Sequence, residues 1–269
     1  MIFWATSPAI LILVFFYFRD RFREPPRIVF YTFVLGILSV IPIVIGNIFL
    51  DSYGDGLYAS YFAKDFYTYV LRAAFHEELY KYLILVYFCS RHTEFNEQMD
   101  AIVYGVAVSL GYAAFENVEY VLGHVDYDTT WQSMAAIRVL PTIMHAVNGV
   151  IMGFLLSNVL FVHRNHGKLI LALLIPVFFH GAYNMLLTYA PLLSLLLLLI
   201  MIIYGFVLSR RIRKFQKSKI IEIEIKETLS HSTVFQSIFF SLIVVITSVV
   251  IVIGCLLYTS DAADDTPCV

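Results

Sequence analysis

The sequence predicts an all-α membrane protein, a polytopic bundle of about eight transmembrane helices, and three observations support this fold class. First, 60% of the 269 residues are hydrophobic, only 14% are charged, and the mean hydropathy is +0.80. Soluble domains are about 45–50% apolar and about 25% charged, so a soluble fold would expose too much apolar surface to water. Second, the apolar residues form long runs, and third, the basic residues gather in alternate connections between these runs. The net charge of −2 gives no reason to expect a nucleic-acid partner.

A helix needs about 20 mostly apolar residues to cross the hydrocarbon layer of a bilayer. Eight segments meet this requirement, and we expect transmembrane helices at 2–18, 28–50, 67–89, 99–122, 135–162, 169–188, 191–208 and 234–254. The first segment does not resemble a signal peptide, because no basic region precedes it and no small-residue cleavage site follows it. We therefore expect one integral-membrane domain over 1–254, surrounded by the lipid bilayer.

The charges in the connections predict the orientation, because cytoplasmic loops are enriched in Lys and Arg. The odd-numbered connections carry such residues, including Arg19, Arg21, Arg23, Arg27, Arg91, Arg164, Lys168, Arg210, Arg211 and Arg213. The even-numbered connections contain Lys64 and are otherwise mostly acidic, with Asp51, Asp55, Asp126 and Asp128 among their residues. This pattern predicts a multi-pass protein of the cell (inner) membrane, with its N-terminus on the extracytoplasmic side.

The C-terminal residues 255–269 differ in character from the rest of the chain. The stretch Cys-Leu-Leu-Tyr-Thr-Ser-Asp-Ala-Ala-Asp, from Cys255 to Asp264, resembles the translation of a common transposase sequencing adapter. We therefore expect the natural gene to continue differently after Gly254, and we assign no function to 255–269.

The third predicted span contains two adjacent carboxylates, Glu77 and Glu78, followed by Lys81. Ionisable groups inside a bilayer are costly and are therefore functional candidates. Lys81 lies one helical turn after both carboxylates and can neutralise one of them. A purely structural ion pair would need only one Glu, so the second Glu favours a functional site.

Three further spans contain polar residues at helical spacing. In the fourth span, Glu116 lies deep in the apolar run, on one stripe with Tyr112, Glu119 and Tyr120. The fifth and sixth spans repeat one pattern, in which a His follows a Pro by one turn and an Asn comes one turn later: Pro141, His145 and Asn148, then Pro176, His180 and Asn184. Because proline frees a helical carbonyl and favours a kink, we expect each helix to open beside its imidazole. Arg138, near the outer end of its span, is expected to snorkel toward water.

The depths of these residues indicate a single site. With about 1.5 Å of rise per residue, Glu77, His145 and His180 lie roughly 12–15 Å below the outer ends of their spans, and Glu116 roughly 9–10 Å. All four therefore fall in one layer in the outer half of the membrane. Structural polar residues would have no reason to agree in depth.

The polar motifs resemble those of the PrsW family of intramembrane proteases. This family is distantly related to the type II CAAX prenyl endopeptidases and their Abi-type relatives. The resemblance covers about 67–190 and rests on the ordered motifs Glu77-Glu78-Leu-Tyr-Lys81, Phe115-Glu116-Asn117-Val-Glu-Tyr120, His145, and His180 with Asn184. It implies an endopeptidase whose catalytic set contains the two adjacent Glu residues, the Glu of the second motif and the two His residues. It also implies a membrane-anchored protein substrate, an anti-sigma factor in the best-known member.

Two mechanisms are compatible with these residues. Family members are usually described as metalloproteases, and His145 and His180 with Glu116 could hold a zinc ion that activates water. In a glutamate-type mechanism, Glu77 would be the general base, assisted by His145, while His180 and Asn184 stabilise the oxyanion. The chain has no His-Glu-x-x-His motif, so a conventional zincin site is not expected.

Two other functions compete with the protease interpretation. Buried Glu and His residues also relay protons or bind cations in transporters. However, the polar groups form one layer and do not continue toward the cytoplasm, which argues against a transport path. A catalytically inactive scaffold or immunity protein of the same family is the other alternative, and the complete set of motifs argues against it.

Overall fold

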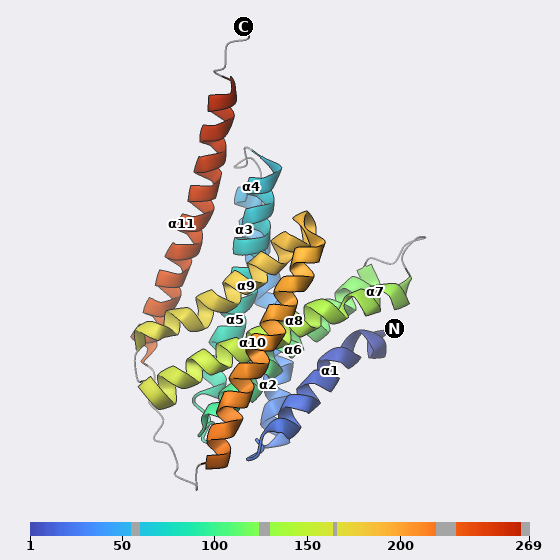
Figure 1. The fold of residues 1–269 in the computed structure, drawn as a ribbon, viewed down its shortest axis with the longest axis vertical. Coiled ribbons are helices and arrows are strands. Elements are labelled where there is room, and N and C mark those ends of the chain that lie inside the picture. The colour runs from blue at the N-terminus through green and yellow to red at the C-terminus, as the bar shows by residue number, and fades with distance from the viewer. Residues whose placement is uncertain (55–59, 124–129, 164–165, 219–229, 265–269) are drawn as a thin grey trace.

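A computed structural model describes residues 1–54, 60–123, 130–163, 166–218 and 230–264, and within these ranges every regular element is a helix. Seven of the described helices are long and apolar enough to cross a membrane. The predicted all-α polytopic bundle is therefore confirmed (Figure 1). The acidic loop residues Asp55, Asp126 and Asp128 lie outside the described ranges.

The elements follow the predicted spans closely. In chain order they are α1 (Ile2–Arg19), α2 (Pro26–Leu38), α3 (Val40–Gly54), α4 (Tyr61–Phe66), η1 (Tyr67–Phe75), α5 (His76–Ile84), η2 (Leu85–Cys89), α6 (Gln98–Gly123), α7 (Trp131–Ile137), α8 (Val139–Ser157), η3 (Asn158–His163), η4 (His166–Lys168), α9 (Leu169–Tyr189), α10 (Pro191–Ser218) and α11 (His231–Asp264). The elements η1, η2 and η3 are π-helical, and η4 is a short 3₁₀ turn. Helix α11 continues to Asp264, and the expectation about 255–269 stays a prediction.

The third predicted span, 67–89, is helical throughout but is not one of the seven apolar helices. Its four charged residues explain the difference: Arg72, Glu77, Glu78 and Lys81. The α-helical part, α5, carries three of them and lies between two π-helical stretches. Inserted π turns within helices are frequent at functional sites, so this segment differs from the lipid-facing helices in both composition and geometry.

The two prolines that precede histidines have different effects. Near Pro141, the helix is interrupted at Arg138, between α7 and α8, as expected for a proline in the first turn. Pro176, by contrast, lies inside α9, which runs without interruption from Leu169 to Tyr189. The carbonyl of Pro176 accepts a bond from Nδ2 of Asn148 at 3.4 Å, which joins α9 to α8.

Helix α6 is the centre of the bundle, and α1, α2 and α8 pack against it. At two of these contacts, a glycine lets the backbones of the two helices approach closely. A Cβ atom at Gly105 would overlap the backbone carbonyl of Gly149 on α8, and one at Gly36 on α2 would overlap the carbonyl of Val108. Small residues allow such backbone contacts between membrane helices, so α6 is held firmly on two sides.

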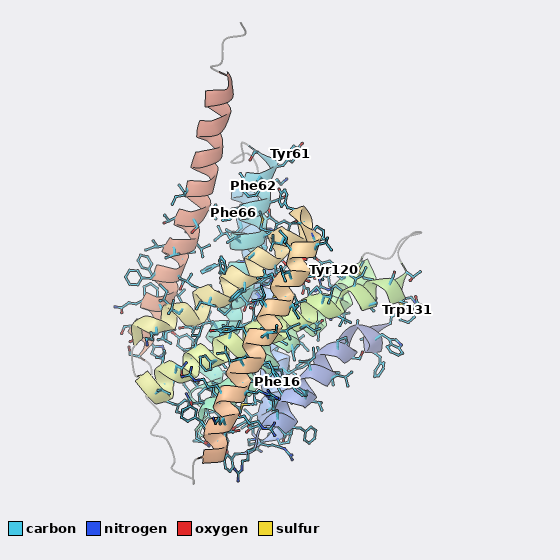
Figure 2. All side chains as sticks on the ribbon, in the orientation of Figure 1. Phe16, Tyr61, Phe62, Phe66, Tyr120 and Trp131 are labelled. Carbon is cyan, nitrogen blue, oxygen red and sulfur yellow. The ribbon has the colours of Figure 1, made fainter. Side chains whose placement is uncertain are left out.

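The outer faces of the peripheral helices are apolar. Large exposed hydrophobic side chains lie on α1, α10 and α11, for example Leu11, Leu192 and Phe235. Figure 2 shows side chains projecting from these faces, with Tyr61 and Trp131 near the ends of the bundle. Exposed apolar surface on this scale indicates contact with lipid, so the chain is a multi-pass membrane protein.

Candidate active site

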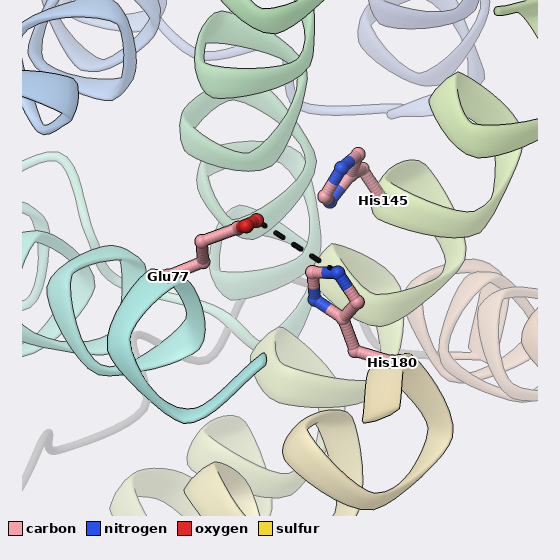
Figure 3. Close-up of side chains that lie close together, drawn as sticks. All are labelled: Glu77, His145 and His180. Atoms are coloured by element: carbon pink, nitrogen blue, oxygen red, sulfur yellow. Dashed lines mark ion pairs between the residues drawn. The ribbon is translucent and has the colours of Figure 1, made fainter. Parts of the chain in front are cut away.

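Four helices bring the predicted polar residues together. Glu77, Glu78 and Lys81 come from α5, Glu116 comes from α6, His145 comes from α8, and His180 comes from α9. In Figure 3, the side chains of Glu77, His145 and His180 point toward one another from three different helices. The structure therefore brings these side chains into one cluster, and their catalytic roles stay predictions.

Lys81 neutralises one of the two adjacent carboxylates. Its Nζ lies 2.9 Å from Oε1 of Glu78 and 3.6 Å from Oε2 of Glu77. The side chains of Lys81 and Glu78 are completely buried. The shorter contact identifies Glu78 as the main partner of Lys81, because a buried charge is stable only when it is paired and hydrogen-bonded.

Glu78 also fixes the orientation of His180. Nδ1 of His180 lies 3.0 Å from Oε1 of Glu78. Since an ionised carboxylate can only accept, Nδ1 carries the proton and Nε2 of the neutral ring keeps its lone pair. This Nε2 lies 3.8 Å from Oε2 of Glu77, the contact that is dashed in Figure 3.

His145 is hydrogen-bonded through both ring nitrogens. Nζ of Lys81 donates to Nδ1 of His145 at 3.1 Å, and Nε2 of His145 donates to Oε2 of Glu116 at 3.1 Å. An ammonium group has donors only, so the ring proton must be on Nε2. The rings of His145 and His180 meet edge-on with centroids 5.0 Å apart, and Nζ of Lys81 lies 4.4 Å from the ring centroid of Tyr112.

The prediction for Arg138 was wrong. This side chain does not snorkel: it is only 7% exposed, forms an ion pair with Glu116 and donates from Nε to Oδ1 of Asn117 at 3.0 Å. Its guanidinium also lies 4.2 Å from the ring centroid of Tyr120. The interruption between α7 and α8 directs Arg138 into the bundle, where it completes a chain of polar contacts.

Within this cluster of polar contacts, one carboxylate has no cation paired closely with it. Arg138 balances Glu116, and Lys81 balances Glu78. The remaining acid is Glu77, and its Oε2 is a buried atom without a hydrogen-bond partner among the described residues. Oε2 of Glu78 is also buried without a partner, but Glu78 is paired with Lys81 through Oε1. Glu77 is therefore the carboxylate of the cluster without a close cation, and its costly unsatisfied oxygen lies beside the free nitrogen of His180.

Known proteins with similar sequences share the region that contains this cluster. A family model described as "PrsW family intramembrane metalloprotease" matches residues 24–209, which include every residue of the cluster. The chain belongs to the PrsW family. The Protease PrsW of Bacillus subtilis (strain 168) is 36% identical over 187 residues, covering 68% of this chain and 80% of that protein. The Protease PrsW of Oceanobacillus iheyensis is 31% identical over 218 residues, covering 80% and 95%. No solved structure matches the chain.

The family match makes this chain a membrane peptidase, and its description as a metalloprotease raises the question of a metal site. In this PrsW-family protein, Glu77, His145 and His180 each offer a ligand atom, and these atoms lie within 4.8 Å of one another. A carboxylate with two imidazoles is a known donor set for catalytic zinc. The unpartnered Oε2 of Glu77 and the free Nε2 of His180 fit a metal, whereas His145 would have to release Lys81 or Glu116.

This ligand group differs from the predicted one in its carboxylate. The sequence suggested Glu116, but the structure groups Glu77 with the two histidines. The carboxylate of Glu116 is already engaged by Arg138 and His145. Depth along a helix could not show whether Glu77 or Glu116 is the available metal ligand. This depends on which carboxylate is already paired with a cation.

Asn184 is not part of the hydrogen-bonded cluster of this PrsW-family protein. It is half-buried, and its backbone carbonyl accepts a bond from Thr188 at 3.4 Å. Among the described residues, its side chain makes no hydrogen bond to the cluster. Two residues that the sequence analysis did not include among the site residues, Arg138 and Asn117, belong to the cluster instead. The position of Arg138 seven residues before His145, two turns away on the same face, was the signal that could have revealed it.

Proposed function

We propose that this chain hydrolyses a peptide bond of a membrane-anchored protein, with Glu77 as the group that activates water. One observation carries the proposal: Oε2 of Glu77 is buried without a hydrogen-bond partner and lies 3.8 Å from a histidine nitrogen that has a free lone pair. A water molecule held between Glu77 and His180 could donate hydrogen bonds to Oε2 of Glu77 and to Nε2 of His180, and Glu77 could act as its base.

The proposed reaction uses groups already present in the chain. Glu77 takes a proton from water while the water oxygen bonds to the peptide carbonyl carbon, and the carbonyl π electrons move to oxygen. When the carbon–nitrogen bond breaks, the leaving nitrogen takes the proton from Glu77, which restores the carboxylate. The ammonium group of Lys81 is 3.6 Å from Glu77, and its positive charge would stabilise the oxyanion.

The remaining polar residues would act by positioning these groups. Glu78 holds the proton of His180 on Nδ1 and fixes the ammonium group of Lys81. Glu116, held by Arg138, fixes His145. Positioning of this kind is needed because small displacements of reacting groups strongly reduce catalysis.

The donor set of Glu77, His145 and His180 suits a zinc ion. A bound zinc ion would supply a Lewis acid and a water molecule that ionises near neutral pH. In that case the carboxylate of Glu77 would serve as a ligand, and His145 would exchange one of its present hydrogen bonds for the metal. Both mechanisms require Glu77, but only one requires metal.

The substrate segment would lie in an apolar groove beside the site. This groove has a volume of about 560 Å³ and is lined by Gly181, the residue after His180, by Val70, and by Val244 of α11. An apolar groove suits the membrane segment of a single-span protein better than a soluble peptide. Ala182 also lines the groove, so narrowing it with Ala182→Trp should raise KM for such a substrate and leave the structure of the polar cluster intact.

The orientation and the substrate identity are also proposals. The basic connections favour an extracytoplasmic N-terminus in the cell (inner) membrane and a cut near the extracytoplasmic side of the substrate. An anti-sigma factor is the substrate class suggested by the family resemblance. Reporter fusions after Arg91 should be cytoplasmic and those after Asp126 extracytoplasmic, and the reverse result would contradict this orientation.

The deciding experiment compares Glu77→Gln with Glu119→Gln, which removes an exposed carboxylate from α6. Both variants are purified in detergent, and their cleavage of a single-span substrate is followed by mass spectrometry of the products. Loss of a general base should reduce turnover by about 10²–10⁴-fold, whereas Glu119→Gln should cleave like wild type. Zinc analysis of the same samples separates the mechanisms: full activity in metal-free protein would favour the glutamate type. Wild-type turnover by folded Glu77→Gln protein would refute both roles of this residue.

A further inference from the structure

A second group of acidic side chains lies at the other end of α6. Asp20, Glu97 and Asp100 each offer a carboxylate oxygen, and these oxygens lie within 4.8 Å of one another. Asp20 follows α1, Glu97 precedes α6, and Asp100 lies in the first turn of α6. Asp100 and Glu116 are 16 residues apart on this helix, which corresponds to about 24 Å. The acidic group is therefore separate from the candidate active site.

Backbone and amide groups fix the orientation of these carboxylates. Oδ1 of Asp20 accepts from the backbone N–H of Phe22 at 3.1 Å and from Nε2 of Gln216 at 2.8 Å. Oδ2 of Asp100 accepts from the backbone N–H groups of Asn96 at 2.8 Å and Glu97 at 2.7 Å. Each aspartate is thus held by one oxygen, while its second oxygen is left for another partner.

The second oxygens have no such partner in the described part of the chain. Oδ2 of Asp20 and Oδ1 of Asp100 are buried without a hydrogen bond, in residues that are 3% and 0% exposed. The amide of Gln216, on α10, gives an independent observation. Its nitrogen donates to both Asp20 and Glu97, and its Oε1 is also buried and unpartnered, in a residue that is 4% exposed.

A fourth carboxylate increases the negative charge. The carboxyl group of Glu24, which accepts a hydrogen bond from the hydroxyl of Tyr104, also faces Asp100. Two carboxylates in direct contact need either a proton or a cation between them. No Lys, Arg or His nitrogen of the described residues forms an ion pair with Asp20, Glu24 or Asp100. The charge of Arg23 is close enough to affect Asp20 but does not form an ion pair with it.

We propose that Asp20, Glu97 and Asp100 bind a hard divalent cation, Mg²⁺ or Ca²⁺, with Glu24 and Oε1 of Gln216 available as additional oxygen ligands. Carboxylate and amide oxygens are the ligands that these ions prefer. Oxygens on opposite sides of a Ca²⁺ ion are about 4.6–5.2 Å apart, and these ligand atoms, which lie within 4.8 Å of one another, are close enough to share one ion. The ion connects the segment after α1, the start of α6 and the end of α10, at the end of the bundle that the basic connections assign to the cytoplasm.

A shared proton is the competing explanation. Burial raises the pKa of Glu24 to about 7, and burial also raises the pKa of Asp20 above its usual value. Burial disfavours the charged form of both carboxylates, and either a cation or a proton could offset this cost. The two explanations predict different responses to divalent ions and are separated by the following experiment.

The full-length protein is purified in detergent, stripped with a chelator and titrated separately with MgCl₂ and CaCl₂, with KCl as the ionic-strength control. Binding is measured by calorimetry and stability by thermal unfolding. Wild type should bind about one ion per chain and should show a saturable increase in Tm that KCl does not reproduce. Glu94→Gln, which removes an exposed carboxylate from the same connection, should bind and respond like wild type.

The variants Asp100→Asn and Asp20→Asn should lose the binding and the increase in Tm. Asp100→Asn keeps one oxygen for the backbone N–H groups and replaces only the unpartnered oxygen. In the chelator, Asp20→Asn should be at least as stable as wild type, because it removes repulsion between carboxylates. A His145→Ala variant should still bind the ion, which places binding outside the active site. No saturable binding by wild type, or unchanged binding by both Asp variants, would overturn the proposal in favour of the shared proton.

Discussion

Replacing Arg138 by Met should destabilise the bundle and disturb the active site. The guanidinium is 7% exposed, pairs with Glu116 and donates to Asn117. Methionine fills part of the same volume but leaves the carboxylate of Glu116 without its cation. Removing one partner of a buried ion pair costs about 3–5 kcal/mol, because the other charge stays buried and unpaired.

The structure favours the lower end of this range. The side chain of Glu116 is 17% exposed, so some solvent can reach the carboxylate after the substitution, and His145 still donates to it. We therefore expect a loss of about 3 kcal/mol, which corresponds to a decrease in Tm of roughly 6–12 °C for a chain of this size. Arg72→Met is the matched control, because its ion pair with Asp51 is solvent-exposed and should contribute only about 0–1 kcal/mol.

The assay is a double-mutant cycle measured by thermal unfolding in one detergent. Glu116→Gln keeps an acceptor for His145 and removes the charge, so Arg138→Met/Glu116→Gln should recover much of the stability that Arg138→Met loses. Recovery is expected because replacing both partners of a buried pair is often close to neutral. Strictly additive effects of the two substitutions would show that Arg138 and Glu116 do not interact energetically, and would refute this reasoning.

Three other predictions follow from contacts described above. Glu78→Gln should lower kcat by about 10–100-fold with little change in KM, since it weakens the orientation of His180; an unchanged kcat would contradict the positioning role. Gly105→Ala should destabilise the protein by about 1–3 kcal/mol through overpacking, whereas Gly123→Ala, with open space around it, should not; thermal unfolding tests the pair. Without divalent ions, stability should fall as pH rises from about 5 through 7, because the raised pKa of Glu24 makes the folded state bind more protons than the unfolded state; Glu24→Gln should weaken this dependence and leave the smaller contribution of Asp20.

Much of the fold could be predicted because the bilayer limits the possible structures. Apolar runs of the required length gave spans that agree with the observed helices within a few residues, for example 99–122 and Gln98–Gly123. The third span showed the limit of this reasoning, because hydropathy describes contact with lipid, whereas α5 is largely buried among other helices. Its length and helical structure could be predicted, but not its π-helical turns.

The candidate site could be predicted as a set of residues but not as a network. Periodicity and depth grouped Glu77, Glu116, His145 and His180, because all must point into the bundle at a similar level. They could not show which cation meets which acid, since this depends on the rotation of each helix and on the interruption at Arg138. For the same reason Asn184, one turn from His180, was included although its side chain does not join the hydrogen-bonded cluster.

The glycine contacts of α6 have a consequence for the response to bilayer thickness. Because Gly105 and Gly36 allow α8 and α2 to touch the backbone of neighbouring elements, sliding α6 along its axis would force carbonyl groups into one another. Hydrophobic mismatch should therefore be absorbed by tilting of the outer helices α1, α10 and α11, which present apolar side chains to lipid. The level of Glu116 relative to His145 would then stay constant in thin and thick membranes, so that lipid chain length changes how a substrate enters the site more than how it is cut.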